Sequence, residues 1–377
     1  MSQGAGRARA LSIVQVVDNL NAGGLERFAI DLGAAHRAAG HASAILCLGE
    51  EGALAAQARG SRIDVEAFNK RPGLDLPAVW KLARALRRRG KVDVVHSHNP
   101  GNHHYAVAAA KLAGVAVAIN TRHGVSSSSG ARYNERYFKW VLPWTDKVVY
   151  VSADSERYYT GAGIVPASQG VTILNGTPLE PFLAAPRVAA PDGRLRLATV
   201  GRLVPVKGHA MLLEAFAGLL RTHPGAAELR IYGAGELGPA LEADIARLGL
   251  AGHAFLAGET RNVAEALAAA DVFVFSSSSE GLPIVILEAL ASGLPVISTR
   301  VGGVPEVAPE GEVAWYCPPG DAGAFAGLLR QALGDRAELA RRGHRARLLA
   351  QERYSIQAAQ QRYELLCRQL LASKGRE

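Results

Sequence analysis

Short apolar segments alternate with longer segments of helical periodicity along nearly the whole chain. In the first half the apolar segments have the length of β-strands and lie near residues 12–17, 43–48, 63–66, 92–96, 115–119, 147–151 and 171–174. Helical patterns separate several of them, at 24–39, 76–90 and 102–113. This alternation is typical of βαβ units, in which successive strands run parallel and helices cover the sheet. The sequence therefore predicts the α/β class, with doubly wound parallel sheets.

The same pattern restarts in the second half, which indicates a second domain. Strand-like segments lie near residues 195–200, 228–232, 253–257, 272–275 and 295–298, and the chain is helical from about residue 321, with no further strand after about residue 316. Asn175-Gly176 and the Pro- and Ala-rich stretch 178–193 favour a linker. A chain of 377 residues is also long for a single core. We predict two doubly wound α/β domains, residues 1–177 and 194–354, joined by the linker 178–193.

Composition indicates a globular protein of a reducing compartment. Apolar residues make up 49% of the chain, and no apolar run approaches the length that spans a bilayer. The apolar stretch 11–17 ends at Asp18 without a cleavage site, so we interpret it as a first strand and not as a signal peptide. Cys47, Cys317 and Cys367 are widely spaced, which predicts neither disulfides nor a zinc site. We expect a cytoplasmic location.

The net charge of +8 is concentrated in the first half of the chain. Residues 1–180 hold 21 Lys and Arg against 14 Asp and Glu, a net +7, whereas residues 181–377 hold 21 against 20, a net +1. The densest stretches are 80–91 and 132–140, and the second mixes cations with aromatic side chains. These stretches fit either solvated helix faces or contact with an anionic membrane surface or acceptor. No recognised nucleic-acid-binding motif is present, so we expect no nucleic acid partner.

Two glutamates in the second half form the most informative motif. Glu280 and Glu288 follow the apolar segment 272–275, with Gly281 suited to a tight turn and Pro283 to the first turn of a helix. We therefore expect Glu280 in a strand-to-helix loop and Glu288 on the helix. The unpaired backbone N–H groups of a helix start attract anions. Two carboxylate acceptors beside such donors suit a polyhydroxylated, phosphate-bearing ligand such as a sugar nucleotide, although two solvated glutamates could share this spacing.

Other polar or glycine-rich motifs also follow predicted strands. Arg202 and Lys207 flank the loop after strand 195–200, and two cations at a helix start suit a diphosphate. Gly23 and Gly24 follow the first strand and open a long helix, where the absence of side chains allows close approach of a phosphate or sugar. Surface cations on a loop and a plain glycine turn remain the alternatives.

Two further loops belong to the same group. Gly302-Gly303 follows strand 295–298 and precedes a helix start. We expect it to close the ligand-binding cleft that the other strand-end loops would line. His123 follows strand 115–119 and can hydrogen-bond a substrate hydroxyl, although a single histidine is more often structural. In parallel α/β sheets ligands bind beyond the carboxyl ends of the strands, which is where all these residues are expected.

A glycine motif offers a competing interpretation. Gly233 to Gly238 form a complete GxGxxG after a strand, and Glu259 lies about twenty residues further on, as in dinucleotide-binding proteins. The motif follows the second strand of its predicted domain, whereas the dinucleotide fingerprint normally uses the first. NAD binding is therefore kept as an alternative.

A histidine-rich stretch raises the question of a metal. His96 and His98 point to the same side if both lie in a strand, and His103-His104 follow. Because no acidic or cysteine partner lies at a useful spacing, we interpret the histidines as lining the cleft and not as a metal site.

Taken together, these segments resemble the retaining glycosyltransferases of family 4, also called glycosyl transferases group 1. The resemblance covers nearly the whole chain and implies the GT-B fold, in which two Rossmann-like domains face each other across a cleft. Its most specific part runs from Ser279 through Glu280 and Glu288 to Pro305-Glu306. The remaining motifs occur in the expected order: Gly23-Gly24-Leu25-Glu26, Asn175-Gly176 and Arg202 with Lys207.

The resemblance implies a role for each donor-side residue. Arg202 and Lys207 would bind the donor diphosphate and stabilise it as it leaves, and Glu288 would hold the ribose hydroxyls. Glu280 would hold the transferred sugar together with the backbone of the residues that follow it, namely Gly281, Leu282, Pro283 and Ile284.

The first domain would complete the site. His123 would touch the sugar near the anomeric carbon, and Gly23 and Gly24 would line the phosphate and acceptor side. The last helix, about residues 355–377, would cross back to pack on the first domain.

By resemblance the protein would move a sugar from a nucleotide-sugar, with UDP as the commonest nucleotide, to a lipid-linked or polysaccharide-precursor acceptor with retained configuration. The process would belong to envelope or exopolysaccharide biosynthesis, with peripheral contact to an anionic membrane. We expect no metal or other cofactor, because Arg202 and Lys207 would stabilise the developing negative charge. A sugar-nucleotide epimerase of the same fold, or a non-catalytic nucleotide-sugar-binding protein, are the alternatives.

Overall fold

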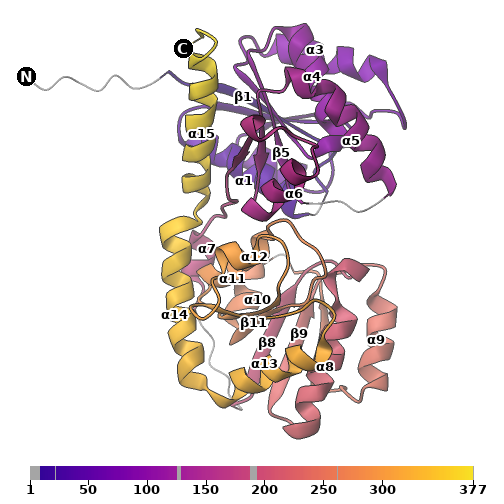
Figure 1. The fold of residues 1–377 in the computed structure, drawn as a ribbon, viewed down its shortest axis with the longest axis vertical. Coiled ribbons are helices and arrows are strands. Elements are labelled where there is room, and N and C mark those ends of the chain that lie inside the picture. The colour runs from indigo at the N-terminus through magenta and orange to yellow at the C-terminus, as the bar shows by residue number, and fades with distance from the viewer. Residues whose placement is uncertain (1–8, 22, 125–128, 187–192, 261, 377) are drawn as a thin grey trace, which may run out of the picture. The chain divides into compact units, whose positions relative to one another are not determined.

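The chain folds into two compact α/β units. The computed structural model describes residues 9–21, 23–124, 129–186, 193–260 and 262–376, with side chains 129–134 excepted. The first unit comprises Met1–Gly176 with Ile356–Glu377, and the second comprises Thr177–Ser355 (Figure 1). Each contains one parallel sheet with helices packed against it, as the alternating sequence pattern predicts.

The first unit contains a seven-stranded parallel sheet. Its order is β3-β2-β1-β4-β5-β6-β7, so the strand order reverses between β1 and β4, as in a doubly wound sheet. Val14 of β1 pairs with Ala44 of β2 on one side and with Val95 of β4 on the other. The strands are β1 (Ser12–Val17), β2 (Ala42–Cys47), β3 (Asp64–Ala67), β4 (Val94–His98), β5 (Val117–Arg122), β6 (Lys147–Tyr150) and β7 (Gly170–Thr172).

Helices cover both faces of this sheet because alternate strand residues point to opposite faces. Val14 and Val16 pack toward α3 and α4, whereas Val17 and Ile45 pack toward α1 and α2. The helices are α1 (Gly24–Ala38), α2 (Ala55–Gly60), α3 (Leu76–Arg88), α4 (Pro100–Ala113), α5 (Ser129–Val141), α6 (Ala153–Gly161) and α15 (Ile356–Ala372).

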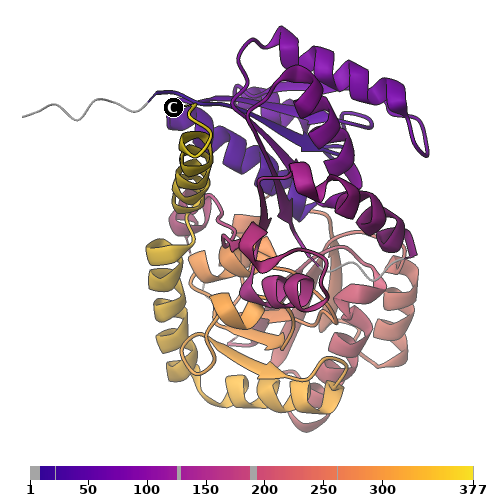
Figure 2. The same cartoon turned by 45° about the horizontal axis from the view of Figure 1, so that its top comes forward.

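The last helix, α15, packs within the first unit. Figures 1 and 2 both show it (yellow) beside α1 (indigo). The Tyr363 hydroxyl on α15 lies 3.0 Å from Thr121 Oγ1 on β5, and Glu364 lies 3.0 Å from His41 Nε2 at the start of β2. The carboxyl-terminal segment is therefore part of the first core.

The second unit contains a six-stranded parallel sheet of order β10-β9-β8-β11-β12-β13. Its strands are β8 (Leu195–Val200), β9 (Ala227–Tyr232), β10 (Ala254–Gly258), β11 (Val272–Phe275), β12 (Val296–Thr299) and β13 (Ala314–Cys317). Strand β13 is absent from the predicted set. Its residues are all apolar, a pattern that a short buried helix shares, and its place in the sheet is fixed by pairing with β12.

The helices of the second unit vary widely in length. They are α7 (Glu180–Ala184), α8 (His209–Thr222), α9 (Gly238–Arg247), α10 (Val263–Ala268), α11 (Ile284–Ala291), α12 (Val304–Val307), α13 (Ala322–Gly334) and α14 (Arg336–Arg353). No helix in the described part of the chain is both long and apolar enough to cross a membrane.

The stretch 178–193, expected as a linker, contains a packed element. Helix α7 buries Phe182, which is 7% exposed, and packs against α10 and α11. Arg347 of α14 donates a hydrogen bond to the Leu183 carbonyl at 2.5 Å. The first part of the predicted linker therefore belongs to the second unit, and residues 187–192 lie outside the described residues.

Candidate active-site residues in the two units

In the second unit, three loops emerge side by side from the carboxyl ends of neighbouring strands. Strands β8, β11 and β12 are adjacent in the sheet, and their loops are residues 201–208, 276–283 and 300–303. Ligands of doubly wound sheets bind at this edge. The sheet therefore brings together three of the motifs that the sequence indicated.

The first two loops are joined through their backbones at Gly208. This residue has a φ of +65°, and a Cβ atom there would lie 2.2 Å from the Ser276 carbonyl oxygen. Ser276 Oγ donates to the Lys207 carbonyl at 2.8 Å, and Ser278 N donates to the Val206 carbonyl at 2.8 Å. This close approach fixes the backbone of Lys207 against the loop that carries Glu280.

Lys207 and Glu280 form an ion pair where these loops meet. Lys207 Nζ lies 2.6 Å from Glu280 Oε1, and the two side chains are only 18% and 15% exposed. The ammonium group also lies 5.5 Å from the centre of the Phe275 ring, at the end of β11. The arrangement places a cation beside a carboxylate acceptor in a partly desolvated setting, where charge interactions are stronger than in water.

The third loop packs on the second. Gly303 N donates to the Gly281 carbonyl at 2.7 Å. Gly302 has a φ of +49°, and a Cβ atom there would lie 2.2 Å from the Glu280 carbonyl oxygen. A side chain at Gly302 would therefore displace the backbone that carries Glu280.

The helix that follows Glu280 begins where the sequence predicts. Helix α11 starts at Ile284, with Pro283 as its N-cap residue in an extended conformation. Leu282 and Ile284 are 4% and 7% exposed, so their buried side chains support the loop. Glu288 lies on α11 and is 6% exposed, which is an unusual degree of burial for a carboxylate.

Arg202 stands apart from this group. Its side chain is exposed, and among the described residues none forms an ion pair or hydrogen bond with its guanidinium group. Its carbonyl lies 3.3 Å from Nε2 of the buried His209, whose pKa is lowered to about 4 by burial. The structure therefore brings Lys207 to Glu280 but does not bring Arg202 to either.

The GxGxxG motif after β9 has a structural explanation. A Cβ atom at Gly233 would lie 1.9 Å from the Gly201 carbonyl oxygen, and one at Gly235 would lie 2.5 Å from the Leu203 carbonyl oxygen. Leu203 N also donates to the Ala234 carbonyl at 2.9 Å. These glycines make room for the loop after β8, so the protein's own backbone accounts for them without a dinucleotide.

In the first unit, Gly23 and Gly24 occupy the start of α1, as expected. Gly23 is the N-cap residue with an extended φ of −169°. A Cβ atom at Gly24 would meet no protein atom within 4 Å, and one at Gly23 would meet only the flexible carboxylate of Glu26, 2.1 Å away. No backbone packing requires these glycines, in contrast to those of the second unit.

His123 directly follows β5, which ends three residues later than predicted, at Arg122. Its Nε2 lies 2.9 Å from Nδ1 of His98, and its backbone N–H donates to Asn99 Oδ1 at 3.2 Å. The edge of the Phe28 ring packs against it, with centroids 5.5 Å apart. Burial lowers the pKa of His123 to about 3, so the imidazole is neutral at physiological pH.

His96, His98 and His103 do not line an open surface, which corrects the expectation for them, whereas His104 is partly exposed. His96 and His98 do share one side of β4, with ring centroids 4.3 Å apart, but they are only 1% and 0% exposed. His103 is equally buried between Ser97 Oγ and Thr145 Oγ1, each at 2.7 Å. Within the described residues no group of three or more His, Cys, Asp or Glu is placed to hold a metal ion.

One residue of this network escaped sequence analysis. Gln15 is fully buried in the middle of β1, where its Oε1 lies 2.9 Å from His98 Nε2. The available signal was a polar residue, one of two together with Ser12, within the otherwise apolar stretch 11–17. Its partner is 83 residues away, so the pairing depends on strand register and not on local sequence.

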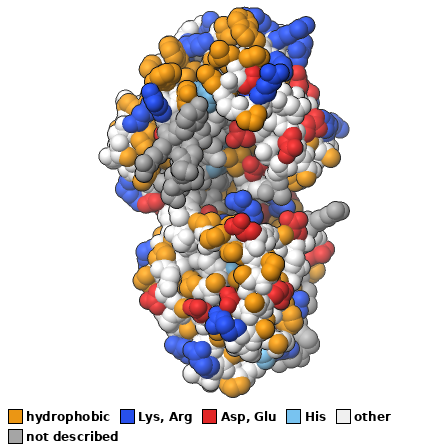
Figure 3. Space-filling model, turned by 90° about the vertical axis from the view of Figure 1, so that its right-hand side faces the viewer, with side chains coloured by type: hydrophobic (Ala, Val, Ile, Leu, Met, Phe, Trp, Pro, Cys, Tyr) orange, Lys and Arg blue, Asp and Glu red, His pale blue; other side chains and the backbone are white. Residues whose placement is uncertain are grey.

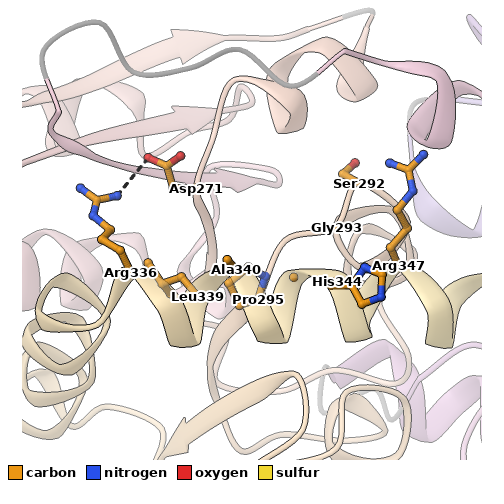
Figure 4. A pocket seen from close by; sticks show the side chains of 10 residues that line it. Asp271, Ser292, Gly293, Pro295, Arg336, Leu339, Ala340, His344 and Arg347 are labelled. Atoms are coloured by element: carbon orange, nitrogen blue, oxygen red, sulfur yellow. Dashed lines mark ion pairs between the residues drawn. The ribbon is translucent and has the colours of Figure 1, made fainter.

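A cavity of about 410 Å³ lies at the opposite edge of the second sheet (Figure 4). Asp271 and Pro295, which line it, directly precede β11 and β12. Its two arginines are already engaged, because Arg336 donates to the Gly193 carbonyl at 2.9 Å and Arg347 donates to the Leu183 carbonyl. The cavity lies away from the loops of Lys207 and Glu280, and its cations hold the chain that leads into β8.

Comparison with known protein families accounts for both units. Residues 22–181 match the family Glycosyltransferase Family 4, and residues 184–349 match Glycosyl transferases group 1. The two matches follow one another and include each loop described above. The chain belongs to the family 4 glycosyltransferases.

Individual relatives match part of this chain. It is 29% identical over 237 residues to the putative glycosyltransferase EpsF of Bacillus subtilis. This match covers 59% of the chain and 61% of EpsF. The chain is 40% identical over 179 residues to the lipopolysaccharide core biosynthesis glycosyltransferase LpsE of Rhizobium meliloti, covering 47% and 49%. Thus the chain spans about half to three fifths of the length of the curated relatives it matches.

Solved structures show the same fold. HepE of Anabaena in complex with UDP superposes with a TM-score of 0.82 at 21% identity, covering 94% of this chain and 99% of that one. Sucrose-phosphate synthase of Thermosynechococcus elongatus gives 0.78 at 21% identity, covering 96% and 100%. The family 4 glycosyltransferase therefore has the GT-B fold, with two parallel α/β sheets.

Proposed function

We propose that this glycosyltransferase moves a sugar from a UDP-sugar to a lipid-linked or polysaccharide-precursor hydroxyl, with retention of anomeric configuration. The observation that carries the proposal is the Lys207–Glu280 pair, 2.6 Å apart, at the joined carboxyl ends of β8 and β11. A phosphate-binding cation and a sugar-binding carboxylate are needed at neighbouring points of a nucleotide-sugar. Structures of HepE with UDP and with UDP-glucose support UDP as the nucleotide.

The second unit would bind the donor. Lys207 and the exposed Arg202 would neutralise the diphosphate, and Glu288 would accept hydrogen bonds from the ribose hydroxyls. Glu280 would accept hydrogen bonds from hydroxyls of the transferred sugar. The backbone of Gly281, Leu282, Pro283 and Ile284 would support it. Because Gly302 and Gly208 lock this backbone, the site is preorganised before the donor arrives.

The reaction would be a displacement on one face of the sugar. The acceptor hydroxyl oxygen bonds to the anomeric carbon on the face from which the diphosphate departs. The bond from that carbon to the diphosphate oxygen breaks, its electron pair stays on the diphosphate, and the hydroxyl proton passes to the departing phosphate oxygen. Lys207 and Arg202 would stabilise the charge that develops there, the role that metal ions fill in other transferases.

The first unit would bind the acceptor and complete the sugar site. His123 would contact the sugar near its anomeric carbon, and the open space beside Gly24 would admit phosphate or acceptor. LpsE is named for lipopolysaccharide core biosynthesis, and a relative in Escherichia coli is named a galactosyltransferase acting on a diphosphoundecaprenol-linked sugar. These names support a lipid-linked or glycan acceptor.

We further propose that α3 helps the first unit to reach an anionic membrane surface on the cytoplasmic side. Leu76 and Trp80 on α3 are 62% and 61% exposed, and Lys81 and Arg84 on the same helix are exposed too. On the visible face of the first unit, Figure 3 shows hydrophobic, basic and acidic side chains intermixed. In the predicted aromatic–basic stretch 132–140, side chains 132–134 lie outside the described residues.

The donor assignment is tested by thermal stabilisation with UDP, GDP, ADP and NAD in the wild type and in Glu288→Ala. A ligand at a hundred times its Kd adds about 2.7 kcal/mol of stability, which is a clear melting shift. We expect UDP to stabilise the wild type and not Glu288→Ala, while Glu214→Ala, at an exposed position of α8, behaves as wild type. Stabilisation by NAD alone would overturn the proposal.

Two reactions without transfer are separated by product analysis. Conversion of a UDP-sugar to its epimer in the absence of any acceptor would identify an epimerase. UDP-sugar binding without turnover across a broad set of lipid-linked and glycan acceptors would identify a binding protein. The proposal predicts release of UDP that depends on acceptor, with an α- or β-linkage that matches the donor.

Membrane contact is tested by flotation with vesicles of phosphatidylglycerol and phosphatidylcholine at low salt. We expect binding that Leu76→Ser/Trp80→Ser weakens and that high salt abolishes. Leu365→Ser, which alters an equally exposed leucine on α15, is the matched control and should bind as wild type. Equal flotation of the α3 variant would contradict the proposed surface.

A further inference from the structure

A continuous chain of hydrogen bonds leads from the backbone of α1 to His123. Gln15 Nε2 donates to the Ala29 carbonyl at 2.8 Å, and Gln15 Oε1 lies 2.9 Å from His98 Nε2. His98 Nδ1 in turn lies 2.9 Å from His123 Nε2. Gln15 and His98 are both 0% exposed, so water does not compete for these bonds.

The chain has a defined direction because its first member can only accept. The Ala29 carbonyl requires the Gln15 amide nitrogen to face it, which turns the amide oxygen toward His98. That oxygen is an acceptor, so His98 Nε2 carries the proton. A neutral imidazole has one N–H, so His98 Nδ1 is an acceptor and His123 Nε2 is the donor to it. The remaining nitrogen of His123, Nδ1, therefore carries a lone pair.

Burial keeps the imidazole rings of His98 and His123 neutral. Burial, together with the neighbouring His96 and His123, holds the pKa of His98 well below its usual range. The pKa of His123 is lowered to about 3 by burial, so neither ring takes up a second proton near neutral pH. Each ring then has one donor and one acceptor, as the chain requires.

Packing fixes the orientation of the last ring. The rings of His98 and His123 stack with centroids 5.2 Å apart, and the edge of Phe28 contacts His123. Asn99 Oδ1 accepts from the His123 backbone N–H. His123 is nevertheless less completely buried than His98, and in the described part of the chain no group hydrogen-bonds its Nδ1.

We propose that Gln15 and His98 are positioning residues that hold His123 as its Nε2-protonated tautomer, so that Nδ1 accepts a hydrogen bond from a sugar hydroxyl. The identity of that hydroxyl rests on the proposed function, whereas the tautomer does not. His123 then selects a hydroxyl that donates a hydrogen bond to Nδ1. His123 itself does not donate a proton to that hydroxyl. The opposite tautomer would present an N–H to the same hydroxyl and would lose this preference.

The tautomer is read directly by NMR of protein labelled with ¹⁵N at histidine. The His123 signal is assigned by its loss in His123→Asn. We expect a protonated Nε2 and an unprotonated Nδ1 in His123 from pH 6 to pH 8. An Nδ1-protonated His123, or a ring that takes up a second proton within this range, would overturn the inference, whether or not the protein transfers sugar.

Substitution of Gln15 tests the direction of the chain. Gln15→Met removes both ends of the amide link, so His98 can reverse and drive His123 toward the Nδ1-protonated form. Gln15→Glu, buried and therefore protonated, can donate to the Ala29 carbonyl and accept from His98, so it should restore the wild-type tautomer. An unchanged His123 tautomer in Gln15→Met would contradict the proposed control by Gln15.

A matched buried histidine separates positioning from stability. His103 is also fully buried and also makes two side-chain hydrogen bonds, to Ser97 and Thr145, but it lies outside the chain to His123. We expect Gln15→Met to lower kcat about tenfold, the effect of one neutral hydrogen bond, with UDP affinity unchanged. His103→Phe should lower the melting temperature with kcat retained, and equal kcat losses in both variants would refute a specific role.

Failure of the proposed function and failure of the positioning role give different experimental results. If wild-type protein neither binds UDP nor transfers sugar while His123 has the expected tautomer, the proposed function is wrong and the hydrogen-bond chain stands. If transfer occurs and Gln15→Met retains full kcat, the proposed function stands and the positioning role is wrong.

Discussion

The loops that carry Lys207 and Glu280 in the second unit are joined mainly through the backbone, whereas His123 in the first unit is held mainly through side chains. In the second unit, glycines such as Gly208 and Gly302 allow carbonyl oxygens of neighbouring loops to approach closely, and the charged pair Lys207–Glu280 sits where these loops meet. In the first unit, neutral groups such as Gln15 and His98 connect β1, β4 and β5 through hydrogen bonds.

This difference matches the chemistry expected of each unit. A diphosphate carries negative charge, so it requires cations held on a backbone that does not need to reorganise. A sugar or acceptor hydroxyl is uncharged, so it is recognised by neutral groups of fixed hydrogen-bond direction.

Acid should destabilise the first unit before the second. Burial lowers the pKa of several histidines of the first unit far below 6.5, with His36, His103 and His123 each at about 3 and His96 and His98 well below their usual range. In the second unit burial lowers the pKa of His209 to about 4. Because the first unit contains more histidines of lowered pKa than the second, acid should destabilise the first unit first.

The sign follows from proton uptake on unfolding. Unfolded histidine takes up a proton below about pH 6.5, while the folded rings stay neutral, so the unfolded state binds more protons and stability falls as pH falls. Each such histidine costs about 1.4 kcal/mol per pH unit in this range. Calorimetry from pH 7 to pH 5 should show one transition moving down steeply and a UDP-sensitive transition moving little. Parallel movement of both transitions would contradict the comparison.

Removal of the cation should cost more rate than any change in the neutral chain. Lys207→Ala removes a charge that would stabilise the departing diphosphate and leaves Glu280 without its partner, so kcat should fall about 100- to 1000-fold. Lys207→Arg should retain a larger share of activity, since it keeps the charge. Steady-state kinetics give the comparison with the tenfold loss expected for Gln15→Met, and a smaller loss in Lys207→Ala would reverse the account.

The fold could be predicted from the sequence, whereas the side-chain network of the first unit could not. The apolar runs specify most strands because buried parallel strands are apolar on both faces, although the apolar run at residues 313–317 was not assigned as a strand. Glu280 and Lys207, 73 residues apart, were both expected at the carboxyl ends of strands, but their direct pairing depends on the order of those strands in the sheet. Gln15 and His98 meet through strand register, a property of the assembled sheet that no local pattern contains.

Substitution of Gly233 in the second unit and of Gly24 in the first should have unequal effects on stability. Gly233→Ala places a methyl group against the Gly201 carbonyl and should lower the free energy of unfolding by about 3 kcal/mol. Gly249→Ala, with a φ of +68° but open space around it, should cost about 1 kcal/mol. Gly24→Ala in the first unit should change stability by less than about 1 kcal/mol. Denaturant titration measures all three, and a large loss in Gly24→Ala would remove the contrast.

The smallest expected effect concerns the attachment of α15 to the first unit. Burial alone would raise the pKa of Glu364, but His41, Gln360 and Arg368 outweigh it and lower the pKa to about 2. The resulting stability is present above the unfolded pKa of about 4.3 and is lost as pH falls toward 2. Glu364→Gln should therefore cost about 1–2 kcal/mol at pH 7, and this difference should shrink below about pH 5. A pH-independent difference would exclude the carboxylate as its source.

Hydrogen exchange with and without saturating UDP tests most directly whether the charged strand-end loops of the second unit form the donor site. We predict that UDP slows exchange most in residues 201–208 and 276–291, and that Glu288→Ala abolishes this protection. Protection confined to residues 233–238, or to the first unit, would contradict the central claim.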